Sequence, residues 1–497
     1  MAIGTTGETL SGNAAIDPLL DEKKWNSATL TVGFPVASSA WAGYGTESEP
    51  FSGFTPLTSD QQQAVSAALG SWSGVAALNF VSVTEPGQTA DIRFAGTSDA
   101  TTAYTYLPSG APQGGDVWFG PRITGVGTWV PGSYQYDTAV HEIGHAIGLK
   151  HPQDTIPGGI VADPAADSIE ESVMSYRSYP GAPLSGYTIA GGSYPGGPML
   201  DDIAAAQYLY GANYATNAGD TVYRFTPDQG TIFRTIWDGG GNDSYDLSAY
   251  ATGVSVDLAP GAWSTFSTAQ LAHLDVRDPS KVARGNVANA FLHGDDPRSL
   301  IENAVGGAGN DTIVGNQAPN TLIGGSGADL LTLPADGTPD TLVYREPTDG
   351  GAPGLASGFD QVTGFEPGID RLALAGDLRS VVDRNQDGAL AGGVRGTGSI
   401  NGTTDEAVFL STPVPSLTDA DFASLRAAVG SFVGPPPGHD LLALATDGTG
   451  TAAYLLAGAG STGGSAPLAP SDVRLLCLFP NVPNIGPNIG LSDLALT

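Results

Sequence analysis

Residues 306–332 repeat with a regular period of nine, because GGAGNDTIV, GNQAPNTLI and GGSGADLLT follow one another without interruption. Glycines let the backbone turn tightly, so carbonyl oxygens and the sixth-position carboxylates of Asp311 and Asp329 can meet a cation between successive turns. A further single copy, DGGGNDSYD at residues 238–246, carries Asp243 at its sixth position. The period predicts an all-β parallel β-roll that binds calcium. The apolar residues expected to point into its core are Tyr245, Ile313, Leu322 and Leu331.

The middle repeat departs from this pattern. Asn320 stands where the sixth-position aspartate is expected, and residues 317–319, Gln-Ala-Pro, replace the glycine-rich turn. We therefore expect this turn to bind calcium poorly or not at all.

The charge of the chain points to the same cation. The 497 residues include 51 acidic and 19 basic side chains, which give a formal net charge of -32. Like charge repels nucleic acid and anionic membranes, so neither is expected as a partner. Carboxylates are hard oxygen ligands, which makes calcium the natural counter-ion, although many acidic proteins use charge only for solubility. Cys477 is the one cysteine, so no internal disulfide can form, and its apolar setting predicts a buried, inert thiol.

The first part of the chain mixes strand and helix signals. We expect Ser59 or Asp60 to cap the first helix, and Asp137 or Thr138 to begin the second. Mixed elements of this kind predict an α+β domain that ends near residue 215. The predicted strands cover 25–35, 90–96 and 114–120, and the predicted helices cover 58–75, 137–148 and 199–211.

The stretch HEIGHAIGLKH carries half of the six histidines of the chain. His141 and His145 lie four positions apart on a predicted helix, so their imidazoles point at one spot. Gly148 can adopt the left-handed conformation that ends the helix and lets His151 return as a third ligand. A zinc ion held by three neutral histidines keeps open positions and lowers the pKa of bound water to about 7. Glu142 is placed to take a proton from that water and pass it to a leaving amine.

This motif and the SVMSY that follows at residues 172–176 resemble the metzincin metalloproteases, and within them the serralysins. The resemblance runs from about residue 20 to about residue 375. It implies that Met174 lies in a turn beneath the zinc. It also implies that Tyr176 is an additional zinc ligand, which swings to stabilise the reacting oxyanion. GGDVWFG, at 114–120, resembles the edge strand against which a peptide substrate lies antiparallel.

The resemblance also places calcium ligands. Within the repeats, Gly307, Gly309, Gly324 and Ser326 are expected to join Asp311 and Asp329. One ion beside the isolated copy is expected to bind Asn217, Gly219, Thr221, Asp238, Gly240 and Asp243, and a neighbouring ion is expected to bind Gly241, Asp243, Leu300 and Glu302.

We predict four segments: a leader or propeptide at 1–17, a zinc protease domain at 18–215, a calcium-binding roll of the RTX class at 216–375, and a β-rich region with a secretion signal at 376–497. DRNQDGAL, at 383–390, opens like an EF-hand loop, but its twelfth position is Val394 instead of Glu. A solvated polar turn is an equally good interpretation of that loop.

The N-terminus shows no signal peptide, and no stretch is apolar for long enough to span a bilayer. Calcium-driven folding outside the cell would reconcile export with this absence. RTX proteins leave through type I secretion machinery that reads an uncleaved C-terminal segment, which the ending LSDLALT resembles.

These features predict a secreted, monomeric zinc endopeptidase that acts on protein and peptide substrates, with one catalytic zinc and several structural calcium ions. Its peptide preference is expected to depend on loop 177–198. The alternative is a calcium-stabilised surface or adhesion protein whose protease-like domain only binds.

Overall fold

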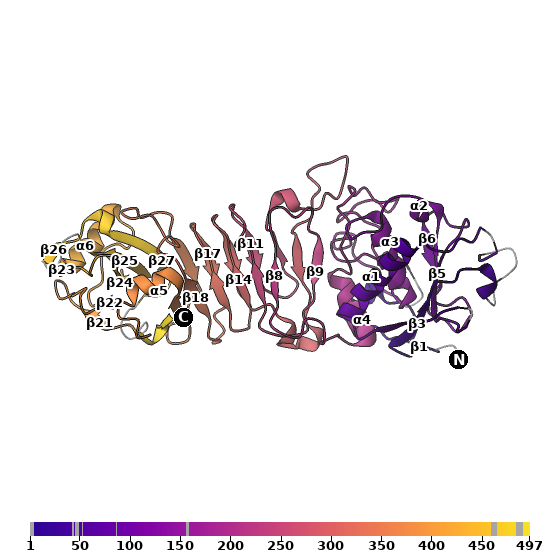
Figure 1. The fold of residues 1–497 in the computed structure, drawn as a ribbon, viewed down its shortest axis with the longest axis horizontal. Helices are drawn as coiled ribbons and strands as arrows, with labels where there is room; N and C mark the ends of the chain where they lie inside the picture. The colour runs from indigo at the N-terminus through magenta and orange to yellow at the C-terminus, as the bar shows by residue number, and fades with distance from the viewer. Residues whose placement is uncertain are drawn as a thin grey trace. The chain divides into compact units, whose positions relative to one another are not determined.

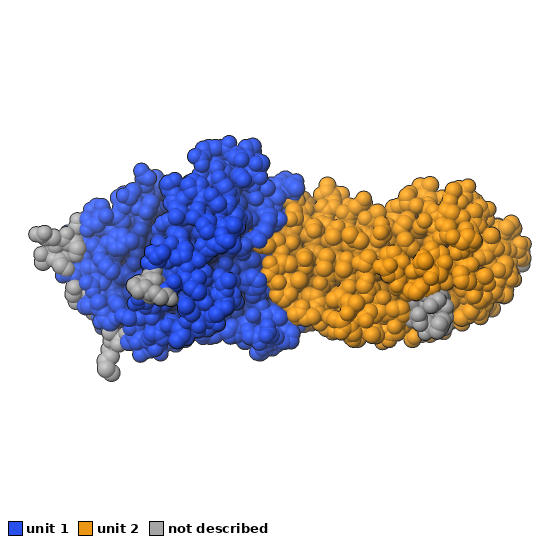
Figure 2. All heavy atoms as spheres, turned by 180° about the vertical axis from the view of Figure 1, so that it is seen from behind, with its two compact units in different colours: residues 1–219, 229–241, 268–299 blue, residues 220–228, 242–267, 300–497 orange. Residues whose placement is uncertain are grey.

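The computed structural model describes residues 4–41, 44, 49–51, 53–85, 87–155, 159–458, 465–483 and 491–497. Residues 1–3 of the predicted leader lie outside this set. The chain forms two compact units, which Figure 2 colours separately. Unit 1 comprises residues 1–219, 229–241 and 268–299, and unit 2 comprises residues 220–228, 242–267 and 300–497. No helix of the described residues is long and apolar enough to cross a membrane.

Unit 1 is built on a five-stranded sheet with the order β4-β3-β5-β7-β6. The first four strands of that order are parallel, and β6 joins β7 in the antiparallel sense. Strand β7 is therefore an inner strand, and the prediction that residues 114–120 form the edge was wrong. The edge on this side is β6, which packs beside helix α3. The strands are β3 (Thr29–Gly33), β4 (Asn79–Ser82), β5 (Ile92–Gly96), β6 (Ala103–Thr105) and β7 (Val117–Phe119).

Three longer helices accompany this sheet, as predicted: α1 (Ser59–Val75), α3 (Tyr134–Ala146) and α4 (Leu200–Tyr210). The N-cap residues of two helices differ from those predicted. Helix α1 is capped by Thr58, whose hydroxyl accepts from the Gln61 amide in a capping box, instead of by Ser59 or Asp60. Helix α3 begins three residues before Asp137, because the Ser133 hydroxyl accepts from the amide of Tyr136. Figure 1 shows α1 beside α3, and the Trp72 indole of α1 donates a hydrogen bond to the Val140 carbonyl of α3.

The segment predicted as a leader has a defined structure from residue 4 onward. Its strand β1 (Thr5–Gly7) pairs antiparallel with β2 (Lys23–Trp25). Removal of this segment remains a prediction. The shorter elements of unit 1 are η1 (Asp17–Leu19), η2 (Ser38–Ala40), α2 (Pro121–Thr124), the parallel pair β9 (Arg234–Ile236) and β13 (Val287–Asn289), η3 (Thr268–Gln270), η4 (His293–Asp295) and η5 (Pro297–Ser299).

Unit 2 contains the predicted parallel roll, in which the strands from β14 to β20 alternate between two sheets. In one sheet Asn303 is in register with Thr321, and in the other Thr312 is in register with Leu330. Within the repeats a coil therefore takes 18 residues, or two nine-residue repeats. The strands up to the last coil are β8 (Val222–Arg224), β10 (Ser244–Asp246), β11 (Ser255–Asp257), β12 (Trp263–Ser264), β14 (Asn303–Val305), β15 (Thr312–Val314), β16 (Thr321–Ile323), β17 (Leu330–Thr332), β18 (Thr341–Tyr344), β19 (Asp360–Thr363) and β20 (Arg371–Leu374).

Apolar ladders fill the interior of the roll. Ile313 pairs with Leu331 on one wall, and both side chains are at most 1% exposed. Tyr245 and Leu322 are fully buried on the other wall. The four predicted inward residues are thus confirmed. Figure 1 shows the strands of this unit side by side, as expected when each coil stacks on its neighbour.

The end of the chain continues both sheets of the roll, because β27 pairs with β19 and β28 pairs with β20. Cys477 lies on β27 and is buried. Part of the Gly-rich link around residues 459–464 lies outside the described residues. The elements are α5 (Gly376–Val382), β21 (Gly392–Arg395), β22 (Ala407–Leu410), η6 (Ala420–Phe422), α6 (Ala423–Val429), β23 (Ser431–Val433), β24 (Asp440–Thr446), β25 (Thr451–Ala457), β26 (Ser465–Pro467), η7 (Pro470–Asp472), β27 (Val473–Phe479), η8 (Leu491–Asp493) and β28 (Leu494–Leu496).

Two neighbouring leucines of β17 give a matched test of the roll core. Leu331 is 1% exposed, whereas Leu330 is 41% exposed on the opposite face. We expect Leu331→Ala to lower the free energy of unfolding by about 2–5 kcal/mol, since it leaves a cavity between coils. Leu330→Ala should change it by only about 0.5 kcal/mol. Denaturant unfolding in calcium measures both, and equal costs for the two variants would contradict the assigned strand orientation.

Candidate active site and metal centre

The three histidines of the motif converge, as predicted. The Nε2 atom of His151 lies 3.2 Å from that of His141 and 3.0 Å from that of His145. Among the described residues, these three form the one group of histidine, cysteine or carboxylate side chains whose ligand atoms all lie within 4.8 Å of one another. Helix α3 supplies His141 and His145, and Gly148, with φ +107°, turns the chain so that His151 faces them.

Hydrogen bonds fix the orientation of each ring. The Nδ1 atom of His141 donates to the Val173 carbonyl at 2.7 Å, and that of His145 donates to the Leu149 carbonyl at 2.8 Å. The Nδ1 atom of His151 lies 2.7 Å from a carboxylate oxygen of Asp154. With the protons held at Nδ1, the three Nε2 lone pairs face one another. Such partners are typical of metal-binding histidines.

This arrangement fits a zinc ion. Zn–N bonds of about 2.0–2.1 Å at tetrahedral angles place the nitrogens roughly 3.3 Å apart, close to the separations seen here. Burial lowers the pKa of His141 to about 4 and that of His151 to about 3, and burial with the two neighbouring histidines puts the pKa of His145 well below its ordinary value. All three rings are therefore neutral and able to bind a cation at neutral pH.

Glu142 lies one residue along α3 and is 5% exposed. The Thr105 hydroxyl of edge strand β6 donates to its Oε2 at 2.7 Å. Burial raises the pKa of Glu142 to about 7, and the hydrogen bond from Thr105 opposes that rise. A carboxylate with a pKa near neutrality can both accept and return a proton.

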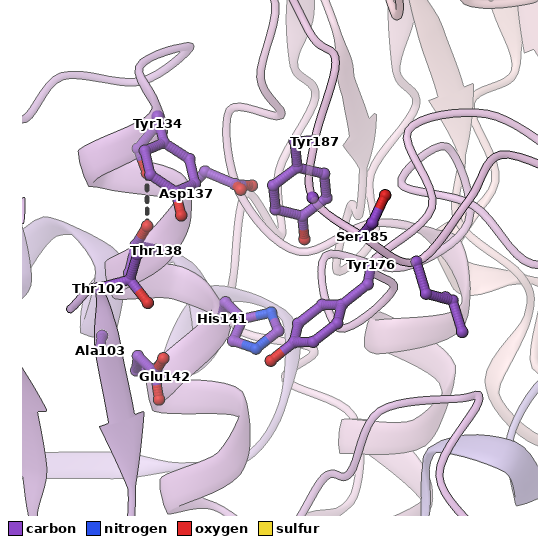
Figure 3. A pocket seen from close by; sticks show the side chains of 12 residues that line it. Thr102, Ala103, Tyr134, Asp137, Thr138, His141, Glu142, Tyr176, Ser185 and Tyr187 are labelled. Atoms are coloured by element: carbon purple, nitrogen blue, oxygen red, sulfur yellow. Dashed lines mark hydrogen bonds between the residues drawn. The ribbon is translucent and has the colours of Figure 1, made fainter. Parts of the chain in front are cut away.

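Met174 and Tyr176 lie where the resemblance placed them, next to the histidines. Met174 is fully buried, and a Cβ added to Gly144 of α3 would overlap its sulfur. The ring of Tyr176 stacks on His141 at 5.7 Å and lies 4.2 Å from His151. Burial raises the pKa of Tyr176 to about 12, so its hydroxyl keeps its proton at neutral pH. Figure 3 shows this hydroxyl directed toward the side of His141 on which Glu142 lies.

A pocket of about 310 Å³ opens beside this cluster. One wall comes from α3 with His141 and Glu142, and the opposite wall comes from residues 184–187 (Figure 3). Thr102 and Ala103 of the β6 region complete it. The loop predicted to influence peptide preference, 177–198, thus contributes directly to the pocket.

Two family models match the chain: the one described as Matrixin over residues 54–157, and the one described as Peptidase M10 serralysin C terminal over residues 202–385. Serralysin G of Dickeya chrysanthemi is 32% identical over 370 residues, which are 68% of this chain and 70% of that protein. The chain belongs to the serralysin family. The predicted resemblance and the predicted fold class, an α+β metzincin-like domain followed by an all-β roll, are confirmed.

Other serralysins are similar over shorter lengths. Serralysin of Proteus mirabilis is 34% identical over 343 residues, which are 61% of this chain and 64% of that protein. Serralysin B of Dickeya chrysanthemi is 35% identical over 288 residues, 52% of this chain and 54% of that protein. The chain therefore spans between about half and two thirds of the length of these two relatives.

In this serralysin-family chain, the sixth-position carboxylates of the repeats accept hydrogen bonds from backbone amides. The amide of Val254 donates to Asp311 Oδ1 at 2.8 Å, and the amide of Gly307 donates to Asp311 Oδ2 at 2.6 Å. The amide of Asp311 in turn donates to Asp329 Oδ1 at 2.8 Å. Asp329 Oδ2 is buried without a hydrogen-bond partner among the described residues. A buried, unpaired carboxylate oxygen fits a bound cation.

Glycines bring the coils close enough for their carbonyls to reach the same region. A Cβ on Gly325 would overlap the Gly307 carbonyl oxygen, and a Cβ on Gly327 would overlap that of Gly309. Burial raises the pKa of Asp329 to about 7. Carbonyl oxygens beside a carboxylate form the donor set that calcium prefers. The number of ions, and ligation by Gly324 and Ser326, remain predictions.

The other predicted calcium ligands fall in both units. In unit 1, the Gly240 amide donates to Asp238 Oδ1 at 2.8 Å, and Asn217 adopts a positive φ of 50°. In unit 2, the Thr221 amide donates to Asp243 Oδ1 at 2.7 Å, and the Asp243 amide donates to Glu302 Oε2 at 2.6 Å. Ligation by these residues and by Gly219, Gly241 and the Leu300 carbonyl remains a prediction.

The middle repeat closes without a carboxylate. Asn320 Oδ1 accepts from the amide of Asn316 at 2.8 Å, while its side-chain amide donates to the Glu302 carbonyl at 2.8 Å. An asparagine both accepts and donates, so it satisfies this turn by itself. These bonds support the expectation of weak calcium binding here.

Sequence reasoning did not find Thr105, Asp154 or Asp202. Asp202 of α4 accepts from the Ser172 hydroxyl at 2.6 Å and from the Val173 amide at 2.8 Å, which holds the turn whose carbonyl orients His141. Local sequence gives no sign of Thr105 or Asp202, because their partners lie 37 and 29–30 residues away. Asp154, three residues after His151, could have been proposed from that spacing.

The carboxylates of the roll predict a calcium-dependent response to pH. Burial raises the pKa of Asp329 to about 7, and that of Asp360 to about 8, above the usual value of about 3.9. The folded roll therefore binds protons more tightly than the unfolded chain, and in chelator its stability should fall as pH rises from about 4 through 8. Millimolar calcium should remove most of this fall, because the ion replaces the lost protons.

Thermal unfolding followed by far-UV circular dichroism at pH 5 and pH 8, with chelator or calcium, measures this effect. Asp329→Asn, which copies the residue found at position 320, should weaken both the pH dependence and the stabilisation by calcium. A roll that is equally stable in chelator and in calcium at pH 8 would contradict the assignment of these carboxylates.

Proposed function

We propose that this chain is a zinc-dependent endopeptidase that hydrolyses peptide bonds of extracellular proteins. The observation that carries the proposal is the buried Glu142 carboxylate, which follows the first of three converging histidines and lines a pocket of about 310 Å³ together with it. Bound at His141, His145 and His151, zinc would supply a Lewis acid and a water of lowered pKa. The similarity to proteins named serralysin supports this function.

The side chains of the protein divide the work of the reaction. Glu142 accepts the proton of the attacking water and delivers it to the amine of the leaving product. Thr105 keeps the Glu142 carboxylate oriented through its 2.7 Å hydrogen bond. Tyr176, which stays protonated, donates a hydrogen bond to the oxygen on which negative charge develops. We also propose that Tyr176 is an additional zinc ligand.

Edge strand β6 offers a backbone on which a peptide can be held. Its inner side pairs with β7, and it lies beside α3 and the pocket. An extended substrate that adds to this edge would run past Glu142 and place one side chain in the pocket. The substrate surface first expected at residues 114–120 is therefore proposed for residues 103–105 instead.

Calcium and cellular location belong to the same proposal. The unpaired carboxylate oxygen of Asp329 and the closely stacked glycine carbonyls support several structural calcium ions in unit 2. Extracellular calcium is abundant, so the roll would complete its folding outside the cell. We propose that a type I secretion system exports the chain.

The test of the catalytic assignment is Glu142→Gln. We expect this variant to bind one zinc ion and to lose about 10³-fold or more of the activity on casein, because Gln cannot accept the proton. Glu85→Gln is the matched control: Glu85 is also buried, accepts from the Ala90 amide at 2.8 Å, and does not line the pocket. Near-normal turnover of Glu142→Gln would overturn the mechanism. A wild-type chain that binds but never cleaves would favour the adhesion alternative.

Export has a separate test. In a bacterial host that carries a type I exporter, the protein should accumulate in the medium, and loss of the exporter should confine it to the cells. Immunoblots of medium and cell fractions measure this distribution. Equal amounts in the medium with and without the exporter would contradict the proposed route.

A further inference from the structure

Asp137 is a buried carboxylate in the pocket that the proposed mechanism does not use. It lies on α3 one turn before His141, and it is 1% exposed. Its Oδ1 atom has no hydrogen-bond partner among the described residues. The side chain lines the pocket, and Figure 3 shows its carboxylate pointing across that space toward Tyr187.

A purely structural carboxylate at this depth would be satisfied by the protein, as the nearby Asp202 is. Asp202 is fully buried, but its two oxygens accept hydrogen bonds from Ser172, Val173 and Met199. Asp137 has no comparable set of donors. Burying an acid without partners costs free energy, so its retention in the pocket indicates a partner that arrives from outside.

The charge around Asp137 defines that partner. No lysine or arginine occurs among the residues that line this pocket in the described part of the chain. Burial, and then the negative charge of Asp202, raise the pKa of Asp137 well above its ordinary value. A cationic group that entered the pocket would meet, among the described residues that line it, no lysine or arginine that competes for Asp137, and it would supply the charge and the donors that Asp137 lacks.

The walls between the catalytic cluster and Asp137 suit a long basic side chain. The rings of Tyr134 and Tyr187 lie 6.1 Å apart, and those of Tyr176 and Tyr187 lie 6.4 Å apart. The methylene stem of lysine or arginine packs well on aromatic faces, which also attract its cationic head. The pocket volume of about 310 Å³ accommodates such a side chain.

The position of Glu142 tells which substrate residue enters the pocket. Glu142 delivers a proton to the leaving amine in the proposed mechanism, and it lines the pocket together with Thr138. The residue that carries this amine, the first residue after the scissile bond, therefore has its side chain nearest to the pocket.

We propose that Asp137 is a specificity-determining residue that selects substrates with lysine or arginine immediately after the scissile bond. The inference rests on the proposed endopeptidase function and names the substrate class of that same site. Asp137 forms a charge-assisted hydrogen bond with the basic head, while the tyrosines hold its stem. A substrate with an uncharged side chain of the same length leaves the carboxylate unpaired and is cleaved less efficiently.

The experiment uses the full-length zinc- and calcium-loaded protein and a proteome-derived peptide library, with cleavage sites mapped by mass spectrometry. The Glu142→Gln variant supplies the background. Lysine and arginine should be enriched at the first position after the cut. Cleavage no greater than that background would refute the proposed function itself, whereas abundant cleavage without this enrichment would overturn the role of Asp137 alone.

A matched peptide pair then measures the effect. Two fluorogenic peptides differ only at that position, one with lysine and one with norleucine, which has the same stem without the charge. For the wild type we expect kcat/KM to favour lysine by roughly 10–100-fold. In Asp137→Asn, whose side chain has the same shape, the ratio should fall to within about threefold of one.

Zinc content and the thermal midpoint of Asp137→Asn show whether the variant is intact. If an intact variant keeps the wild-type ratio, the inference is overturned. If the variant does not fold, the kcat/KM ratio of the wild type for the lysine and norleucine peptides still tests the inference. A ratio at or below one would exclude a selective acid in the pocket.

Discussion

The Nε2 atom of His151 lies 3.0–3.2 Å from those of His141 and His145, and the surrounding elements of unit 1 must hold the three rings in this arrangement. Their lone pairs converge on a space that a cation must occupy, so the fold has to hold the rings there against mutual repulsion. Two of the rings are oriented by backbone carbonyls, those of Val173 and Leu149. Val173 is in turn held by Asp202 of α4, which means that a helix remote in sequence determines the geometry of the metal centre.

The same constraint operates in unit 2 with oxygen in place of nitrogen. Aspartates recur along the coils, and each accepts an amide hydrogen bond from a neighbouring coil, as Asp311 does from Val254 and Asp329 does from Asp311. These bonds leave carboxylate and carbonyl oxygens gathered in tight turns that only glycine can form. Both units thus concentrate electron-rich ligand atoms, nitrogens that suit zinc in unit 1 and oxygens that suit calcium in unit 2.

The parts that could be predicted from the sequence are those whose partners are close in the chain or repeat with a fixed period. His141 and His145 are one helical turn apart, and the roll core follows from a nine-residue period. The inner position of β7 could not be predicted, because strand order depends on pairing with β6, whose residues carry no distinctive signal. The role of Thr105 could not be predicted for the same reason, because its hydroxyl reaches Glu142 only when β6 lies beside α3.

Asn320 shows why the distribution of aspartate and asparagine in the roll has physical meaning. Its amide donates to a carbonyl and its oxygen accepts from a backbone amide, so the turn is satisfied by protein atoms alone. An aspartate can only accept, which leaves an oxygen such as Asp329 Oδ2 without a partner. The Asp329 turn therefore keeps an oxygen that a proton or a cation can complete, whereas the Asn320 turn does not. Asn320 interrupts a series of buried aspartates, Asp311, Asp329, Asp340 and Asp360, so the proposed calcium dependence of the roll does not extend to its turn.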